Sequence, residues 1–153
     1  MNTYFPHVVV DRAAERSFRR RAVQAYPNEM METLWGRVVG DTLYIHLFMP
    51  IEHKGNPTTV AYAEHDLTDQ EDEAEEHKLE LLGTIHSHPD CLDALFSYGD
   101  LQDIQDKTDL IMGICAVTQE FSQGKKRRNC EIAYWPCPHP MRVTYSTKRK
   151  GTK

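Results

Sequence analysis

Two histidines, His86 and His88, stand two residues apart at the end of an apolar segment, immediately before Pro89. Leu82 and Ile85 lead into the pair, as expected for a buried strand. Residues i and i+2 of a strand point to the same side, with Cα atoms about 6.5 Å apart. Pro89 has no backbone donor and therefore suits the end of a strand. The segment predicts a strand that presents two imidazoles side by side, as a metal site requires.

A hydroxyl and a carboxylate follow within the same stretch. Ser97 and Asp100 have the spacing of a helix start, with Ser97 as the N-cap, and capping is the simplest interpretation of either residue alone. A catalytic zinc usually takes three protein ligands and leaves a fourth position for water. Close to the histidine pair, Asp100 is therefore the best candidate for a third ligand, and Ser97 is a candidate polarising hydroxyl.

The pattern His-x-His-Pro followed by Ser-x-x-Asp resembles the JAMM (MPN-type) zinc metalloproteases, in particular compact prokaryotic members that stand alone. That family also has an upstream segment of the form Pro-x-Glu-x-x-Gly-x-Leu-x-Gly. Residues 27–36 of this chain match it at four positions, which are Pro27, Glu29, Leu34 and Gly36. In element order the resemblance extends from about residue 7 to residue 135.

The resemblance implies a role for five side chains. His86, His88 and Asp100 would bind Zn²⁺, Ser97 would stabilise the oxyanion, and Glu29 would be the catalytic glutamate. Zinc lowers the pKa of bound water to about 7. Because Glu29 is not needed as a ligand, it would be free to accept that water's proton and to deliver it to the leaving amine.

Two features depart from the family pattern. Glu32 stands where the family commonly has glycine, so the backbone packing there is expected to differ. The run from Pro89 to Phe96 has eight residues, where the family usually has seven. A bulge can absorb the extra residue, and Asp93 is the alternative third ligand.

The rest of the chain predicts alternating strands and helices. The expected elements are strands at His7–Val10, Glu29–Val39, Thr42–Met49, Thr58–Ala63, Leu110–Thr118, Cys130–Trp135 and Met141–Thr147, helices at 11–25, 64–78 and 100–107, a turn at Gly40–Asp41 and a polar loop at Gln119–Asn129. The almost wholly apolar Leu110–Thr118 predicts a strand buried on both faces, hence a sheet covered on both sides. The resemblance implies an α/β fold, a mixed central β-sheet flanked by helices as in the cytidine deaminase-like sandwich.

Composition places the chain among ordinary globular proteins. At 153 residues it is expected to form one domain over residues 1–147, with a basic tail at 148–153. We expect a cytoplasmic protein, since no apolar run approaches the ~18 residues of a membrane span and residues 1–10 lack a signal-peptide pattern. The four cysteines form no C-x-x-C pair, so neither a disulfide framework nor a cysteine-rich zinc module is indicated.

Charge is segregated along the sequence. Residues 64–80 hold nine acids and one lysine, and five arginines lie between Arg12 and Arg21. Both groups are most simply solvated faces. The net charge of −5 gives no reason to expect nucleic acid as a partner, and no membrane partner is expected.

The resemblance implies an (iso)peptidase that cleaves after the C-terminal glycine of a ubiquitin-like modifier, in deconjugation or precursor maturation. One alternative is a JAMM peptidase acting on another peptide, such as a phage tail or cell-wall peptide. Another is a non-catalytic MPN scaffold, although that class normally lacks the ligands. A zinc deaminase needs His-x-Glu and Pro-Cys-x-x-Cys, which this chain does not have.

Overall fold

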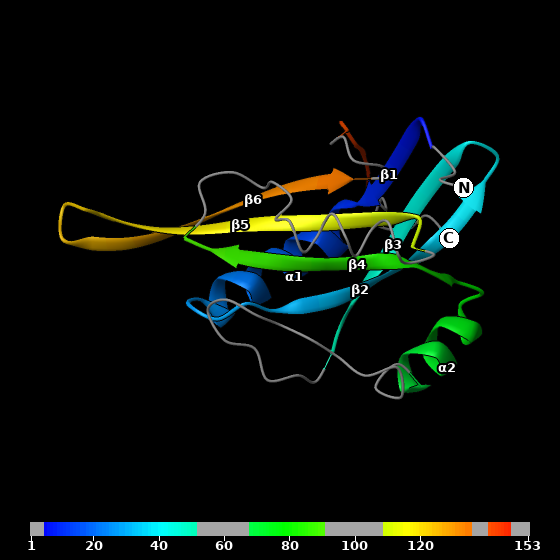
Figure 1. Cartoon of the computed structure of the whole chain (residues 1–153), viewed down its shortest axis with the longest axis horizontal. Helices are drawn as coiled ribbons and strands as arrows, with labels where there is room; N and C mark the ends of the chain where they lie inside the picture. The colour runs from blue at the N-terminus through cyan, green and yellow to red at the C-terminus, as the bar shows by residue number, and fades with distance from the viewer. Residues whose placement is uncertain (1–4, 52–67, 91–108, 136–140, 148–153) are drawn as a thin grey trace.

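Seven strands form one mixed sheet within residues 5–51, 68–90, 109–135 and 141–147, the part of the chain that the computed structural model describes (Figure 1). The strands are β1 (His7–Asp11), β2 (Met31–Val39), β3 (Thr42–Pro50), β4 (Glu80–Pro89), β5 (Ile111–Ser122), β6 (Lys125–Trp135) and β7 (Thr144–Ser146). Their order across the sheet is β6-β5-β4-β2-β3-β1-β7. The pairs β1–β3, β1–β7 and β4–β5 are parallel, and the other pairs are antiparallel.

The helices α1 (Arg12–Ala25) and α2 (Thr68–Glu76) pack on opposite faces of this sheet. α1 begins where the Asp11 side chain accepts a hydrogen bond from the Ala14 amide at 2.8 Å. Its Phe18 packs in a core cluster that also contains Leu34 of β2. Thr33, the preceding residue, points to the other face and hydrogen bonds to Gln70 of α2. The sheet is therefore covered on both sides, as predicted.

Most of the expected elements are present. The α/β fold class is confirmed, as are the β1–α1 unit with Asp11 as its N-cap and the β2–β3 hairpin that turns at Gly40–Asp41. α2 is shorter than the expected helix at 64–78, and β7 is shorter than the expected strand at Met141–Thr147. The expected strand at 58–63, the expected helix at 100–107 and the basic tail at 148–153 lie outside the described residues, so the domain boundaries stay predictions.

The prediction of a polar loop at Gln119–Asn129 is wrong. β5 and β6 continue through this segment as a regular antiparallel hairpin, with Gln119 opposite Arg128 and Ser122 opposite Lys125. Gln123 and Gly124 form its two-residue turn at φ values of 52° and 72°, as a type I′ turn requires. The hairpin projects well beyond the end of β4 (Figure 1).

None of the helices in the described part of the chain has both the length and the apolar character needed to cross a membrane.

Candidate metal centre

His86 and His88 lie near the end of β4, on the sheet face that points away from α1. Side chains alternate between the two faces along a strand. Ile85 belongs to the core cluster beneath α1, so its neighbour His86 points to the opposite face, and His88 points the same way as His86. The two Nε2 atoms are 2.9 Å apart, and the ring centroids are 4.7 Å apart. Two nitrogens on one tetrahedral zinc at ~2.05 Å would be ~3.3 Å apart. The pair therefore converges closely enough to share an ion.

The register of β2 and β4, continued past Met31, aligns Glu29 with this pair. Met31 is opposite His86. The ladder continues one residue further, since the Ser87 amide donates to the Met30 carbonyl at 2.9 Å. The same register places Glu29 opposite His88. Residues opposite one another in an antiparallel pair share a face of the sheet, so half-buried Glu29 is on the histidine face.

Ser87 is a positioning residue that sequence reasoning missed. Its side-chain oxygen accepts a hydrogen bond from the Met30 amide at 2.9 Å, so both its backbone and its side chain hold the segment that carries Glu29. The residue sits between the two histidines on the opposite face of β4 and is buried. Its small hydroxyl inside the His-Ser-His run was the only signal in the sequence.

An apolar floor borders the histidines on the β5 side. In the parallel β4–β5 register Ile114 is next to His86 and Ala116 is next to His88. Both belong to a buried cluster with Met112 and Trp135. His86 is itself only 6% exposed. Low exposure and apolar neighbours reduce the local dielectric, which strengthens the interaction of these rings with a cation.

Ser97, Asp100 and the alternative ligand Asp93 all lie outside the described residues. Within the described ranges, no cluster of three or more His, Cys, Asp or Glu side chains is arranged to hold a metal. The structure thus brings the two histidine rings together, and the register of β2 and β4 aligns Glu29 with their face of the sheet. The third ligand and the oxyanion-stabilising serine stay predictions.

The Glu32 departure from the family motif has a structural explanation. Glu32 points to the α1 face, where Arg21 donates to both of its carboxylate oxygens, from Nε at 2.6 Å and from Nη2 at 2.8 Å. Glu32 is fully buried, and burial raises its pKa while Arg21 opposes the shift. The interpretation of the α1 arginines as a solvated face is therefore wrong for Arg21. It is also wrong for Arg19, which pairs with buried Glu15.

We expect Arg21→Met to destabilise the fold by about 3 kcal/mol, because it leaves a buried carboxylate without its partner. Without Arg21, Glu32 favours the protonated form, so the folded state holds a proton that the unfolded state releases above about pH 4.3. The loss should therefore grow as the pH rises from 5 to 8. Urea unfolding at both pH values measures it.

Two variants control this experiment. Arg20→Met changes an exposed neighbour on the same helix and should alter the free energy of unfolding by less than about 0.5 kcal/mol. The double variant Arg21→Met/Glu32→Leu removes both charges and should recover most of the lost stability. Equal unfolding midpoints for Arg21→Met and the parent protein would show that the pair contributes nothing.

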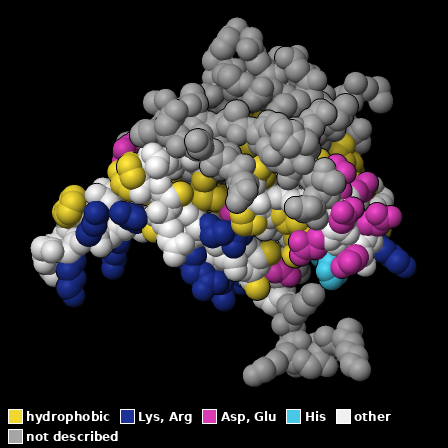
Figure 2. Space-filling view, turned by 90° about the horizontal axis from the view of Figure 1, so that it is seen from below, with side chains coloured by type: hydrophobic (Ala, Val, Ile, Leu, Met, Phe, Trp, Pro, Cys, Tyr) yellow, Lys and Arg dark blue, Asp and Glu magenta, His cyan; other side chains and the backbone are white. Residues whose placement is uncertain are grey.

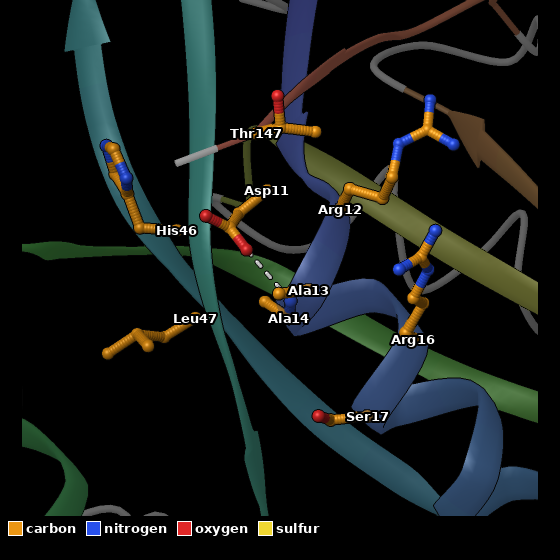
Figure 3. Close-up of a pocket in the computed structure, with 9 residues that line it drawn as sticks. All are labelled: Asp11, Arg12, Ala13, Ala14, Arg16, Ser17, His46, Leu47 and Thr147. Carbon is orange, nitrogen blue, oxygen red and sulfur yellow. Dashed lines mark hydrogen bonds between the residues drawn. The ribbon is translucent and has the colours of Figure 1, made fainter. Parts of the chain in front are cut away.

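A surface pocket of about 540 Å³ lies elsewhere, at the start of α1 (Figure 3). Asp11, Arg12, Arg16 and His46 are among the residues that line it. Its polar side chains do not converge, because Arg12 and Arg16 extend away from Asp11 and His46. Since none of the three candidate site residues lines it, we do not connect this pocket with the metal centre.

Comparisons with known proteins agree with this fold. The family model described as prokaryotic homologs of the JAB domain matches residues 11–131. Protein DSY2949 from Desulfitobacterium hafniense has a similar structure, with a TM-score of 0.63 and 17% identity over 94% of each chain. AF2198, a JAB1/MPN domain protein from Archaeoglobus fulgidus, is similar with a TM-score of 0.55 and 15% identity over 92% of this chain and 99% of its own. A search of curated proteins found no match.

Proposed function

The chain belongs to the family of prokaryotic homologs of the JAB domain, and we propose that it is a zinc-dependent peptidase of the JAMM type. One observation carries the proposal. Two imidazole nitrogens lie 2.9 Å apart at the end of β4. The register of β2 and β4, continued past Met31 through the hydrogen bond from the Ser87 amide to the Met30 carbonyl, supports a position for Glu29 on the same face. Family membership alone is compatible with a hydrolase or with a binding domain, so the site must decide between them.

The donors fit a divalent zinc ion. His86 and His88 would hold it together with Asp100, a set of two imidazoles and one carboxylate that leaves a fourth position open. Such an ion, when bound, lowers the pKa of water and polarises a carbonyl group. We assign Asp100 from the sequence pattern, and Asp93 stays the alternative.

The protein's own residues would carry the proton and the developing charge. Glu29 accepts a proton from the attacking water and delivers it to the leaving amine, a role that needs a carboxylate beside the ion but not bound to it. Ser97 donates a hydrogen bond to the oxyanion of the scissile carbonyl, a type of contact whose removal typically costs about 10²–10³ in rate. The apolar floor formed by Ile114 and Ala116 keeps water away from one side of the pair.

For the substrate we propose the C-terminal tail of a ubiquitin-like protein, cleaved after its terminal glycine. An extended tail suits a site at the end of a strand, where main-chain hydrogen bonds to a sheet edge supply affinity without demanding a particular sequence. Removal of a modifier and maturation of its precursor both present this bond.

The test is cleavage of ubiquitin-like proteins that carry a short extension past the terminal glycine. We expect cleavage at that glycine by the zinc-loaded protein, loss of cleavage with a chelator and recovery when zinc is returned. Chelator-sensitive cleavage of unrelated peptides, with the glycine extensions left intact, would instead favour a peptidase for other targets. Stoichiometric zinc without any cleavage would favour a non-catalytic scaffold.

A further inference from the structure

The distal part of the β5–β6 hairpin does not pack against the hydrophobic core of the described structure. Every residue from Glu120 to Arg127, a segment that we call the arm, is exposed. The arm projects from the sheet at the end of the molecule opposite to α2 (Figure 1). An isolated two-stranded ribbon is marginally stable at best, so a regular ribbon of this length needs support at its base.

Arg128 provides that support. Its Nη1 donates to the Val23 carbonyl at 2.8 Å, and its Nε donates to Gln119 Oε1 at 3.0 Å across the hairpin. Its guanidinium also lies 5.1 Å from the centre of the Tyr26 ring. These contacts join the base of the arm to the end of α1. They hold the base of the arm in place against the rest of the domain.

The arm is basic in an acidic protein. Lys125, Lys126 and Arg127 stand on it against a single acid, Glu120, whereas the whole chain has a net charge of −5. Figure 2 shows most Lys and Arg side chains from the left end to the middle of this face, and most Asp and Glu side chains gathered toward the right end. Phe121 lies opposite Lys126 in the hairpin register, and it is 74% exposed.

β5, the first strand of the arm, passes beside the candidate metal centre before it reaches the arm. Ala116 of β5 is next to His88, and β4 ends one residue later, with Pro89 next to Val117. At about 3.3 Å per residue, Ser122 at the tip lies roughly 20 Å beyond the histidines. A folded protein held by the arm could therefore send an extended tail of about six residues back to the site.

We propose that the arm docks the folded body of the substrate, and that this body presents an acidic surface with an apolar patch. This inference rests on the proposed peptidase function. Lys125 and Lys126 would face carboxylates on the partner, and Phe121 would enter the apolar patch, a combination of aromatic and cationic side chains that is common where binding energy concentrates. Charge complementarity of this kind mainly speeds association and selects the partner.

A protein fits these features better than a nucleic acid does. Salt-dependent binding to a phosphate backbone typically uses about 6–10 contacts from Lys and Arg side chains. The arm offers three cations, Glu120 lies directly opposite one of them, and the net charge of the chain would repel a polyanion. A partner with a few carboxylates around an apolar patch matches the arm without this repulsion.

The test measures binding and cleavage separately. The binding probe is a fluorescent, net-negative ubiquitin-like protein extended past its terminal glycine, titrated into the zinc-loaded protein with Glu29→Gln to prevent cleavage. The double variant Lys125→Glu/Lys126→Glu should weaken the Kd about tenfold or more, and Phe121→Ser should weaken it to a similar extent. The Kd for the unmodified arm should also weaken as salt is raised.

Two controls distinguish docking from damage to the site. Arg16→Glu/Arg20→Glu makes the same charge change on the exposed side of α1 and should leave the Kd within about twofold. With Glu29 intact, the arm variants should raise KM for the folded substrate but cleave the isolated C-terminal tail peptide with unchanged kcat and KM. Failure of the parent to cleave either substrate refutes the peptidase function, while the Kd values still decide the role of the arm.

Three results would overturn the inference. One is a Kd for the folded probe that the arm variants leave unchanged. Another is tighter binding of a DNA or RNA duplex than of the acidic protein, lost in the same variants. The third is self-association of the chain that the arm substitutions abolish, which would make a second copy of the chain the partner.

Discussion

Glu29→Gln is expected to reduce kcat by about 10²–10⁴ and to leave zinc binding intact. Glutamine keeps the size and polarity of the side chain but cannot accept a proton from the attacking water. Because we do not assign Glu29 as a ligand, the histidine pair should still load with one zinc ion per chain. Steady-state cleavage of a glycine-extended ubiquitin-like protein measures the rate, and elemental analysis measures the zinc.

Glu131→Gln is the matched control. Glu131 lies opposite Ala116 on the histidine face of the sheet but on the far side of β5, and it is exposed. Loss of its charge should change kcat by less than about twofold, because charges on the surface are screened from the site by solvent. An undiminished kcat for Glu29→Gln would exclude Glu29 as the base, whereas loss of zinc in this variant would make it a ligand.

The elements with strong local signals were predictable from the sequence. His86 and His88 share a face because strands repeat every two residues, and the apolar run before them specifies a buried strand. Asp11 was recognisable as an N-cap because its carboxylate precedes a helical pattern by one residue. Gly40, at a φ of 61°, marks the β2–β3 turn.

The hairpin that forms the arm was not predictable in the same way. Strand signals come from the alternation of buried and exposed positions, and residues 120–127 are exposed on both faces. Its turn is Gln123–Gly124 and not the Asn-Gly or Asp-Gly that usually marks a type I′ turn. Its regular pairing continues the pairing of β5 and β6 nearer the core, where β5 is buried from Ile111 to Val117.

Contacts between segments that are distant in the chain were also not predictable from the sequence. Nothing local connects Arg21 of α1 with Glu32 of β2, because their pairing depends on how the helix crosses the sheet. The strand order is equally non-local, since parallel pairs such as β4 with β5 join strands that no tight turn connects. Gly36 is a smaller example, because a Cβ there would overlap the Tyr44 carbonyl of β3.

The histidine pair gives the most direct test of the proposed zinc site, because the proposal requires both rings as ligands. His86→Ala and His88→Ala should each purify with little zinc and show no measurable cleavage. Zinc should also raise the melting temperature of the parent, since a ligand present at about 100 times its Kd adds about 2.7 kcal/mol of stability. Neither variant should gain stability when zinc is added, and this readout is independent of activity.

His77→Ala controls for general effects of histidine removal, because His77 is exposed at the end of α2, away from β4's histidines. It should bind zinc as the parent does. Asp100→Ala and Asp93→Ala then identify the third ligand, because only the true ligand should abolish the zinc-dependent rise in melting temperature. If His86→Ala/His88→Ala still bound one zinc ion with the parent's stabilisation, the metal would lie elsewhere, and the 2.9 Å approach of the two rings would be only a feature of strand packing.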